Sequence, residues 1–369
     1  MDREFSILDG RVTIIVDDCF AALSRLPDDS VDCIVTSPPY WGLRDYGVDG
    51  QIGLEPTLAE HLGAMMRVFS EVRRVLKPTG TCWVNYGDCY ATTPNGRSAA
   101  DVKAIGNDDR TFRDKPFSTI QGVLKHKDLC MVPNRFAIAL QEAGWWIRSE
   151  IIWAKPNPMP ESIRDRPATS HEKIFLITKS PRYFYDKESV RQNIAASSVS
   201  RLSQDVENQI GSSRANGGRK TNGNMKAVGR VRGHKREHVG FRDNWDHMTK
   251  EEQGANGRNL RNYEPAPVDV WNIATQPFSD AHFATFPPEL AERCILAGCP
   301  KGGVVLDPFG GAGTTGLVAA RHGRNAVLIE LNPEYAEISK RRIEREWRVM
   351  PSSSGSADFG PLFSSEAAE

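Results

Sequence analysis

The sequence predicts an α/β fold with a mostly parallel sheet and helices on both faces. Short β-branched or apolar runs alternate with segments of helical periodicity up to about residue 93, from 128 to 186, and from 268 to 349. Two glycine- or proline-rich turns directly follow apolar runs, and no internal repeat is present. Such alternation is typical of parallel sheets, because each crossover between parallel strands places a helix on one face.

The individual elements follow from period and composition. Strands are expected at 11–18, 31–37, 81–88, 147–155, 173–179, 303–307 and 325–331. Helices are expected at 58–76, 133–143, 288–297, from the glycine turn to about 322, and at 333–349. The helix that begins at Leu58 has apolar residues at helical spacing, and Pro78 and Gly80 are expected to end it.

Composition divides the chain into four parts. Residues 1–186 are regular apart from a polar loop at about 94–127, and 268–349 are regular again. Residues 187–267 are polar, and their segment 191–262 has 14 Lys and Arg against 7 Asp and Glu. This region is either a disordered linker or a segment that orders on DNA. The tail 350–369 is rich in Ser, Gly and Ala and is expected to be disordered.

The overall charge and the cysteines limit the class of protein. The 47 basic and 47 acidic residues give a net charge of +0, which argues against a protein that coats nucleic acid non-specifically. The seven cysteines include no C-x-x-C pair, so a disulfide framework and a metal site are not expected. With no signal peptide or membrane-length apolar run, the expected location is the cytoplasm.

A glycine-rich turn runs from Asp307 to Gly316 (DPFGGAGTTG), between an apolar strand and a helix. Glycine lets the backbone approach a ligand closely, and free N–H groups at a helix start favour negative charge or a carboxylate. Glu330 ends the next strand, where a carboxylate can accept both hydroxyls of a ribose. This pattern fits NAD and S-adenosylmethionine alike. Asp307 favours the latter, because an acid there can pair with a cationic amino-acid group that NAD lacks.

A second turn, Thr36–Trp41 (TSPPYW), directly follows the strand at 31–37. Its two prolines fix φ and remove two donors, which leaves a rigid turn that presents carbonyl oxygens and one small side chain. These acceptors suit an amino group that must give up a proton, and Tyr40 offers an aromatic face to a planar base. A plain structural turn is the alternative interpretation.

Together the two turns resemble those of the DNA amino-methyltransferases, whose catalytic tetrapeptide is (Asp/Asn/Ser)-Pro-Pro-(Tyr/Phe). Ser37–Tyr40 fits the serine form and Asp307–Gly313 fits the cofactor loop. The catalytic motif precedes the cofactor loop, as in the permuted β arrangement of that family. The similarity covers most of 11–93, 128–186 and 268–345.

This resemblance implies a Rossmann-like methyltransferase sheet, circularly permuted, with an irregular target-recognition insertion. Residues 1–186 would form the catalytic half, 187–267 the target-recognition region or linker, and 268–349 the cofactor-binding half. Lys155 is either a phosphate contact or a solvated lysine, and His282 is expected near the cofactor without a catalytic role.

The implied site has two groups of residues and no metal ion. The catalytic residues are Ser37, Pro38, Pro39 and Tyr40. The cofactor-binding residues are Asp18, His282, Phe283, Phe286, Asp307, Phe309, Gly310, Gly311, Gly313, Thr314 and Glu330. Tyr40, with Trp41, would stack on the flipped base, while Ser37 Oγ and the Pro38 carbonyl accept hydrogen bonds from its amino group.

The expected reaction is methyl transfer from S-adenosylmethionine to an exocyclic amino group in double-stranded DNA. Serine at the first motif position goes mostly with cytosine N4 in this family, so Ser37 favours cytosine N4, with adenine N6 as the alternative. Cytosine C5 methylation needs a cysteine nucleophile, typically in a Pro-Cys pair, and the chain has none. A second copy of the chain and a cognate restriction endonuclease are further candidate partners.

Other classes fit less well. A nicotinamide oxidoreductase would leave the Ser37–Tyr40 motif unexplained. RNA or protein-glutamine methyltransferases usually carry Asn first and place the cofactor loop upstream. A DNA-binding module without activity would be expected to lack the cofactor or catalytic residues, and both sets are present.

Overall fold

The computed structural model describes residues 3–43, 45–93, 117–190, 268–276 and 286–348. The chain divides into two units, residues 1–190 with 269–355 and residues 191–268 with 356–369. The first unit contains every described element. The predicted recognition region at 187–267 and the predicted tail at 350–369 lie almost wholly outside the described residues, so both assignments stay predictions.

The described elements alternate as the sequence predicts. The strands are β1 (Arg3–Ile7), β2 (Val12–Val16), β3 (Val31–Thr36), β4 (Leu76–Tyr86), β5 (Trp146–Ala154), β6 (His171–Thr178), β7 (Val270–Asn272), β8 (Val304–Asp307) and β9 (Asn325–Glu330). The helices are α1 (Cys19–Arg25), α2 (Leu58–Val75), α4 (Val132–Glu142), α8 (Pro288–Gly298), α9 (Thr314–Arg321) and α10 (Pro333–Arg348), with a 3₁₀ turn, η2, at Glu188–Val190.

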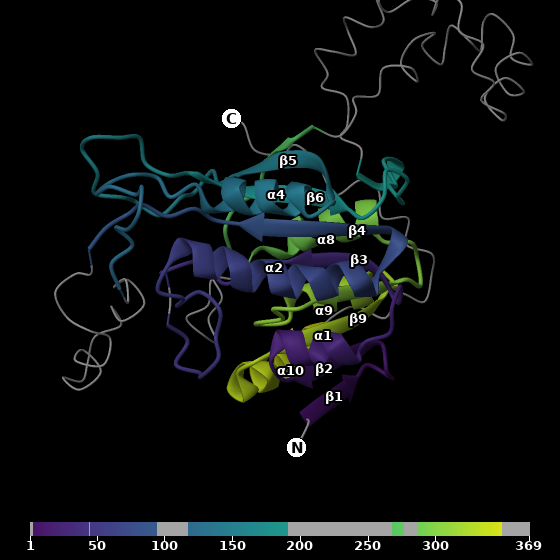
Figure 1. The fold of residues 1–369 in the computed structure, drawn as a ribbon. Coiled ribbons are helices and arrows are strands. Elements are labelled where there is room, and N and C mark those ends of the chain that lie inside the picture. Colours follow the sequence, from purple (N-terminus) through teal and green to yellow (C-terminus); the bar gives the residue numbers. More distant parts are fainter. Residues whose placement is uncertain (1–2, 44, 94–116, 191–267, 277–285, 349–369) are drawn as a thin grey trace, which may run out of the picture. The chain divides into compact units, whose positions relative to one another are not determined.

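The strands form one sheet in the order β1-β2-β9-β8-β3-β4-β6-β5-β7 (Figure 1). Its centre, from β2 to β4, is parallel throughout, which confirms the predicted mostly parallel α/β class. The strands β1 and β6 run antiparallel to their neighbours. The strands from the end of the chain, β8 and β9, lie between β2 and β3 from its beginning, so both halves of the chain build one sheet.

A hydrophobic cluster covers each face of this sheet. One cluster packs α1, α2 and α4 against the sheet, with Phe69 in contact with Phe136 at a ring distance of 4.9 Å. The other packs α8, α9 and α10 against the opposite face. In β3, Ile34 points into the first cluster, and Cys33 and Val35 point into the second. A central parallel strand buried on both faces accounts for its continuous apolar sequence.

Four details differ from the sequence prediction. β1, the short α1 and β7 were not expected from the sequence. The helix α2 begins with a capping box in which Thr57 and Glu60 bond each other's backbone N–H groups, and it ends at Val75. The strand β4 starts at once, at Leu76, rather than at Thr81. Pro78 cannot continue a helix, but the extended backbone tolerates it at the exposed start of the strand.

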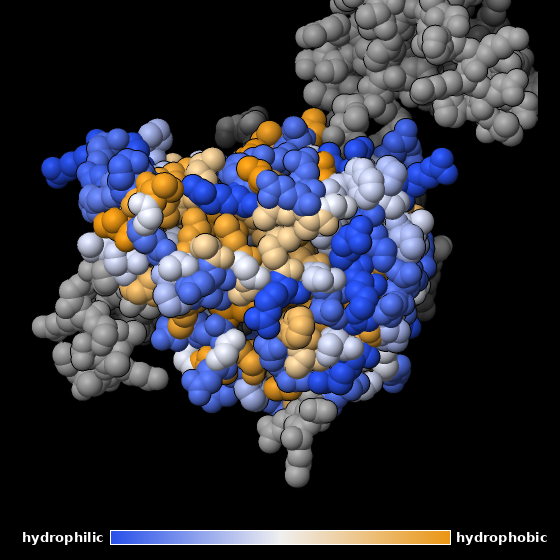
Figure 2. Space-filling view, in the orientation of Figure 1, coloured by the Kyte–Doolittle hydropathy of each residue, from blue (hydrophilic) through white to orange (hydrophobic). Residues whose placement is uncertain are grey.

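The carboxyl ends of the parallel strands meet at one edge of the sheet, where open α/β sheets bind their ligands. Figure 2 shows that the face over α2 mixes hydrophilic and hydrophobic residues, with hydrophobic ones gathered at the left, beside the loops at this edge. Within the described ranges, none of the helices has the length and apolar composition needed to cross a membrane.

Candidate active site

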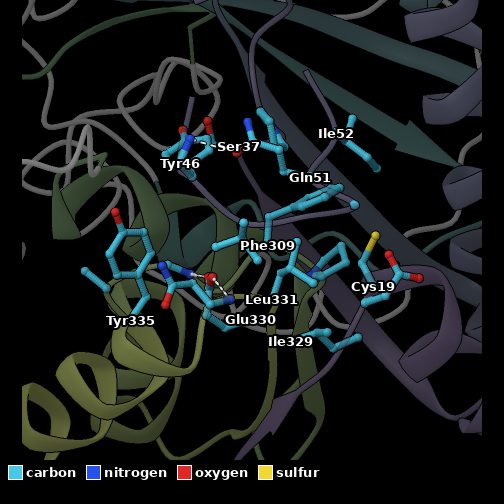
Figure 3. A pocket seen from close by; sticks show the side chains of 18 residues that line it. Cys19, Ser37, Tyr46, Gln51, Ile52, Phe309, Ile329, Glu330, Leu331 and Tyr335 are labelled. Carbon is cyan, nitrogen blue, oxygen red and sulfur yellow. Dashed lines mark hydrogen bonds between the residues drawn. The ribbon is translucent and has the colours of Figure 1, made fainter. Parts of the chain in front are cut away.

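A pocket lies at the carboxyl edge of the sheet, where β2, β3, β8 and β9 end. It is lined by Asp18, Cys19, Ser37, Pro39, Tyr46, Val48, Gly50, Gln51, Ile52, Pro308, Phe309, Gly311, Ala312, Ile329, Glu330, Leu331, Asn332 and Tyr335. In Figure 3, Ser37 and Gln51 lie on one side, Glu330 and Tyr335 lie on the other, and Phe309 lies between them. The pocket therefore brings the two predicted motifs together, although 270 residues separate Ser37 from Asp307 in the sequence.

Asp18 and Glu330 are the acidic residues of the pocket. Asp18 caps α1, where its Oδ1 accepts a hydrogen bond from the Ala21 N–H at 3.0 Å. Glu330 ends β9, and its two oxygens accept hydrogen bonds from the N–H groups of Gly311 at 2.8 Å and Asn332 at 2.9 Å. Burial raises the pKa of Glu330. An ionised carboxylate has about four acceptor positions, so each oxygen of Glu330 keeps capacity for a further donor.

The glycine loop between β8 and α9 packs tightly against its surroundings. Gly311 and Gly313 have φ of +48° and +76°, a conformation that favours glycine. A Cβ on Gly313 would lie 2.2 Å from Ser339 Oγ, and one on Gly310 would lie 3.0 Å from Leu328 Cβ. The Gly311 N–H donates to Glu330, so the loop and the strand end hold each other in place.

Asp307 lies beneath this loop and is 2% exposed. Its Oδ1 accepts hydrogen bonds from Thr36 Oγ1 at 2.7 Å and from the Phe309 N–H at 3.1 Å, and its Oδ2 accepts one from Thr315 Oγ1 at 2.7 Å. Burial raises the pKa of Asp307 to about 7 despite these donors. The carboxyl group thus ties the end of β3 to the glycine loop, and it is not among the residues that line the pocket.

The other predicted cofactor residues occupy different positions. Phe309 lines the pocket, whereas the hydroxyl of Thr314 bonds the guanidinium of Arg342 at 2.8 Å in the interior. Phe286 is buried just before α8. His282 and Phe283 lie outside the described residues, so their role near the cofactor stays a prediction.

One wall of the pocket, which the segment 46–52 forms, was not expected from the sequence. The Tyr46 N–H donates to Gln51 Oε1 at 2.7 Å, which closes this segment into a compact turn. The ring of Tyr46 meets that of Tyr335 edge to face, with ring centroids 6.5 Å apart. This aromatic pair joins the segment after the catalytic motif to the start of α10.

The catalytic motif leads from β3 into a polar cluster formed with β4 and β6. The hydroxyls of Ser37 and Tyr40 lie 3.3 Å apart, and the Tyr40 hydroxyl donates to Glu172 Oε2 at 2.7 Å. Asn85 Nδ2 lies 2.8 Å from Glu172 Oε2, 3.1 Å from the Tyr40 hydroxyl and 3.4 Å from Ser37 Oγ. Lys155 pairs with the other oxygen of Glu172.

Two expectations for this region need correction. Lys155 is not a solvated lysine, because it is 19% exposed, pairs with Glu172 and lies over the Trp153 ring, while its contact with phosphate stays a prediction. Trp41 is not a stacking residue: it is 1% exposed, and its Nε1 donates to the Glu55 carbonyl at 2.9 Å. Tyr40 alone remains in place to offer an aromatic face.

A buried support holds the ring of Tyr40 from behind. The ring centroid of Tyr40 lies 5.6 Å from that of Tyr86, and a Cβ on Gly87 would lie 2.4 Å from Tyr40 Cε2. The Tyr86 hydroxyl contacts His61 Nε2 at 2.5 Å, and His61 Nδ1 contacts Glu55 Oε2 at 2.8 Å. The chain of contacts from Glu55 to Tyr86 fixes the surface on which Tyr40 rests.

The cysteines of the site do not suit covalent catalysis. All seven lie buried and without disulfides. Cys19 is the cysteine that lines the pocket, and burial raises its pKa to about 12, so its thiol holds its proton. Within the described ranges, no group of three His, Cys, Asp or Glu side chains is placed to hold a metal ion.

The polar cluster could not be recognised from the sequence, because its members come from distant strands. Asn85 and Glu172 stand at ordinary strand ends with no local motif. The antiparallel direction of β6 brings its amino end, with Glu172, to the edge where β3 and β4 end.

Comparison with known proteins identifies the family. The DNA methylase family of N6 and N4 methyltransferases matches residues 31–341, so the chain belongs to it. It is 42% identical over 334 residues to the Type II methyltransferase M.Cfr9I of Citrobacter freundii, with 90% of this chain and 88% of that protein covered. It is 41% identical to M.SmaI of Serratia marcescens, with 90% of each chain covered.

Solved structures show the same fold. The PvuII cytosine-N4-specific DNA methyltransferase aligns with a TM-score of 0.55 at 18% identity, over 94% of this chain and 88% of that one. A DNA modification methylase of Thermus thermophilus complexed with S-adenosyl-L-methionine aligns with a TM-score of 0.50 at 23% identity, over 92% and 95%. The predicted Rossmann-like methyltransferase fold is thereby confirmed.

Proposed function

We propose that this DNA methyltransferase transfers a methyl group from S-adenosyl-L-methionine to N4 of cytosine in double-stranded DNA. One observation carries the proposal: Ser37, which opens the Ser-Pro-Pro-Tyr turn, lines the same pocket as the glycine loop and Glu330. Serine in that position of the motif favours cytosine N4 over adenine N6.

The charged side chains of the pocket fit S-adenosylmethionine. Among the lining residues that the structure describes, the charged ones are the acids Asp18 and Glu330, and none is Lys or Arg. Such a pocket suits a ligand that brings hydroxyl and amino donors and a positive charge, and it disfavours the phosphates of NAD. Glu330 would accept the ribose hydroxyls, Asp18 would approach the adenine, and the predicted residues at Asp307 and 282–286 would lie toward the methionine end.

When bound, S-adenosylmethionine supplies a methyl group on a positively charged sulfur, which leaves with the electron pair of the broken bond. The protein positions the acceptor. A base inside a duplex must first flip out, at a cost of a few kcal/mol, before it reaches Ser37 and Tyr40. The Ser37 hydroxyl and the Pro38 carbonyl then accept hydrogen bonds from the amino group, which directs the nitrogen lone pair toward the methyl carbon.

No covalent enzyme intermediate is needed in this reaction. The attacking group is the amino nitrogen of the base, so the protein contributes positioning, hydrogen bonding and exclusion of water. The protonated state of Cys19 is consistent with a mechanism that uses no thiolate. A cognate endonuclease and a homodimer stay predictions, although the relatives are named Type II methyltransferases.

Mass spectrometry of nucleosides tests the proposal. Methyl-free plasmid DNA is incubated with labelled S-adenosylmethionine and with wild-type protein, Ser37→Ala or Tyr40→Ala. The expected product is labelled N4-methylcytosine, lost in both variants. Label in N6-methyladenine would replace the proposed base and keep the catalytic motif. Absence of label from DNA, with cofactor bound, would reject the proposed substrate.

A further inference from the structure

Glu172 connects the catalytic motif to the interior. It is the second residue of β6, 132 positions from Tyr40 in the sequence, and its side chain is 18% exposed. Its Oε2 accepts hydrogen bonds from Tyr40 and Asn85, and its Oε1 pairs with Lys155. A carboxylate that pairs with a lysine ammonium can only accept hydrogen bonds.

The direction of each hydrogen bond in the cluster follows from this carboxylate. A phenol has one proton, and the 2.7 Å contact assigns that proton of Tyr40 to Glu172. In the 3.3 Å contact between Tyr40 and Ser37, the serine hydroxyl must therefore be the donor. Asn85 Nδ2 can only donate, so it does not reverse this order. Ser37 consequently turns its lone pairs, and not its proton, toward the pocket that it lines.

An acceptor at Ser37 is what the reaction requires. The amino group of cytosine or adenine carries only protons in its plane, so a serine that pointed its own proton at the nitrogen would compete with the methyl group for the lone pair. The burial of Tyr40 and the negative charge of Glu172 raise the pKa of Tyr40, so the phenol stays protonated and can donate to the carboxylate.

We propose that Glu172 is a positioning residue that acts through Tyr40 to hold Ser37 as a hydrogen-bond acceptor. The hydrogen-bonded series Ser37–Tyr40–Glu172 also removes the excess proton of the methylated product. The inference rests on the proposed function of amino-group methylation. After methylation the nitrogen carries one extra proton. That proton passes to Ser37 Oγ, the serine proton passes to the Tyr40 oxygen, and the phenolic proton passes to Glu172 Oε2. Each hydroxyl ends neutral, and Glu172 later releases the proton to water.

The contacts fit this transfer without large motion. Of its two hydroxyl-to-oxygen steps, one spans 2.7 Å and the other 3.3 Å, and the longer one is of the kind that tightens when substrate binds. Asn85 holds all three oxygens within 3.4 Å of its Nδ2, while its own Oδ1 is buried without a hydrogen-bond partner in the described structure. The Asn85 amide thus serves the hydroxyl and carboxylate oxygens of Ser37, Tyr40 and Glu172, although its own oxygen has no hydrogen-bond partner there.

A set of variants tests the hydrogen-bonded series Ser37–Tyr40–Glu172. Single-turnover methyl transfer to plasmid DNA is measured for wild type, Glu172→Gln, Tyr40→Phe and the double variant. The matched control is Glu150→Gln, which removes a carboxylate of β5 that pairs with Lys173 of β6 at 2.6 Å. Glu172→Gln is expected to slow the transfer roughly 100-fold, within the range found for positioned proton-transfer groups. The control is expected to stay within about twofold of wild type.

The double variant shows whether Glu172 acts through Tyr40 or whether the two residues act independently. If Glu172 acts through the Tyr40 hydroxyl, the double variant is expected to be no slower than the slower single variant. Dissociation constants for S-adenosylmethionine and DNA are expected to stay within about twofold throughout. Losses that multiply in the double variant, or a Glu172→Gln protein with more than half the wild-type rate, would overturn the proposal.

A spectroscopic readout in the cofactor-free protein complements the rates. With ¹³Cζ-labelled tyrosine, the Tyr40 signal is identified by its loss in Tyr40→Phe. It is expected to shift in Glu172→Gln and to stay in place in Glu150→Gln; no shift in the former would overturn the hydrogen-bond assignment. If Glu172→Gln fails to fold, Tyr40→Phe tests the proposed series of hydrogen bonds by itself, because it removes only the hydroxyl. In that case an undiminished rate overturns the proposal.

The result is separable from the proposed function. All rates are ratios to the wild type on the same DNA, whichever base receives the methyl group. Label in adenine would overturn the cytosine assignment, and the ratios would still decide whether Glu172 acts through Tyr40.

Discussion

Replacing Asp307 with Asn changes the stability of the protein with pH in a way that the structure specifies. The pKa of Asp307 rises from 3.8 to about 7 on folding, because the carboxyl group is buried. At roughly 1.36 kcal/mol per pH unit, ionised Asp307 destabilises the fold by about 4 kcal/mol relative to its neutral form. The asparagine of the variant would be neutral at every pH, and its amide nitrogen could donate to Thr315, whose hydroxyl also contacts the Val35 carbonyl at 3.3 Å.

The direction in which stability changes with pH follows from the raised pKa of Asp307. The stability that protonated Asp307 contributes is fully present below pH 3.8 and is lost as the pH rises through about 7. From pH 5 to pH 8 the wild type should therefore lose about 3 kcal/mol relative to Asp307→Asn, and the variant should be the more stable protein at pH 8.

Urea unfolding at pH 5, 6, 7 and 8, without cofactor, measures this difference, since titrations common to both proteins cancel. Asp49→Asn, at an exposed position of the pocket segment, controls for the loss of one negative charge. A stability difference between wild type and Asp307→Asn that is equal at pH 5 and pH 8 would show that the pKa of Asp307 is not raised, and would refute the reasoning.

Three further substitutions have defined expectations. Gly87→Ala places a Cβ 2.4 Å from the Tyr40 ring, so we expect a loss of about 1–3 kcal/mol in urea unfolding and at least a tenfold slower methyl transfer; wild-type values would mean that the ring is free to move. Glu330→Gln turns an N–H toward the backbone N–H of Gly311 or Asn332, and calorimetry should show at least tenfold weaker binding of S-adenosylmethionine; unchanged affinity would remove Glu330 from the cofactor site. Phe69→Ala empties a fully buried position and should cost about 3–5 kcal/mol in urea unfolding, with cofactor affinity retained in the folded protein.

Much of the fold was predictable because its signals are local. The helix α2 has an apolar stripe, and the central strands have apolar runs bounded by turns, so both were recognised from their period. β1 and β7 were missed because each gains its order from a neighbour, β2 for one and β5 for the other. β7, with three residues, carries little pattern of its own.

The candidate site was predictable only as far as its motifs reach. Ser37 and Glu330 stand next to recognisable turns, and the structure places both in one pocket. Thr314 belongs to the same glycine motif, but its side chain turns inward to Arg342, a contact that depends on where α10 packs. Glu172 has no motif around it, because the direction of β6 and its pairing with β4 bring it to Tyr40.

The position of β8 and β9 between β2 and β3 has a consequence for synthesis on the ribosome. A nascent chain of 190 residues already contains β2 and β3, but the inner edges of both strands lack their partners until residues 304–330 have emerged. The fragment 1–190 carries six of the described strands and the fragment 269–369 carries three, and the two are expected to assemble into one sheet when expressed together as separate polypeptides.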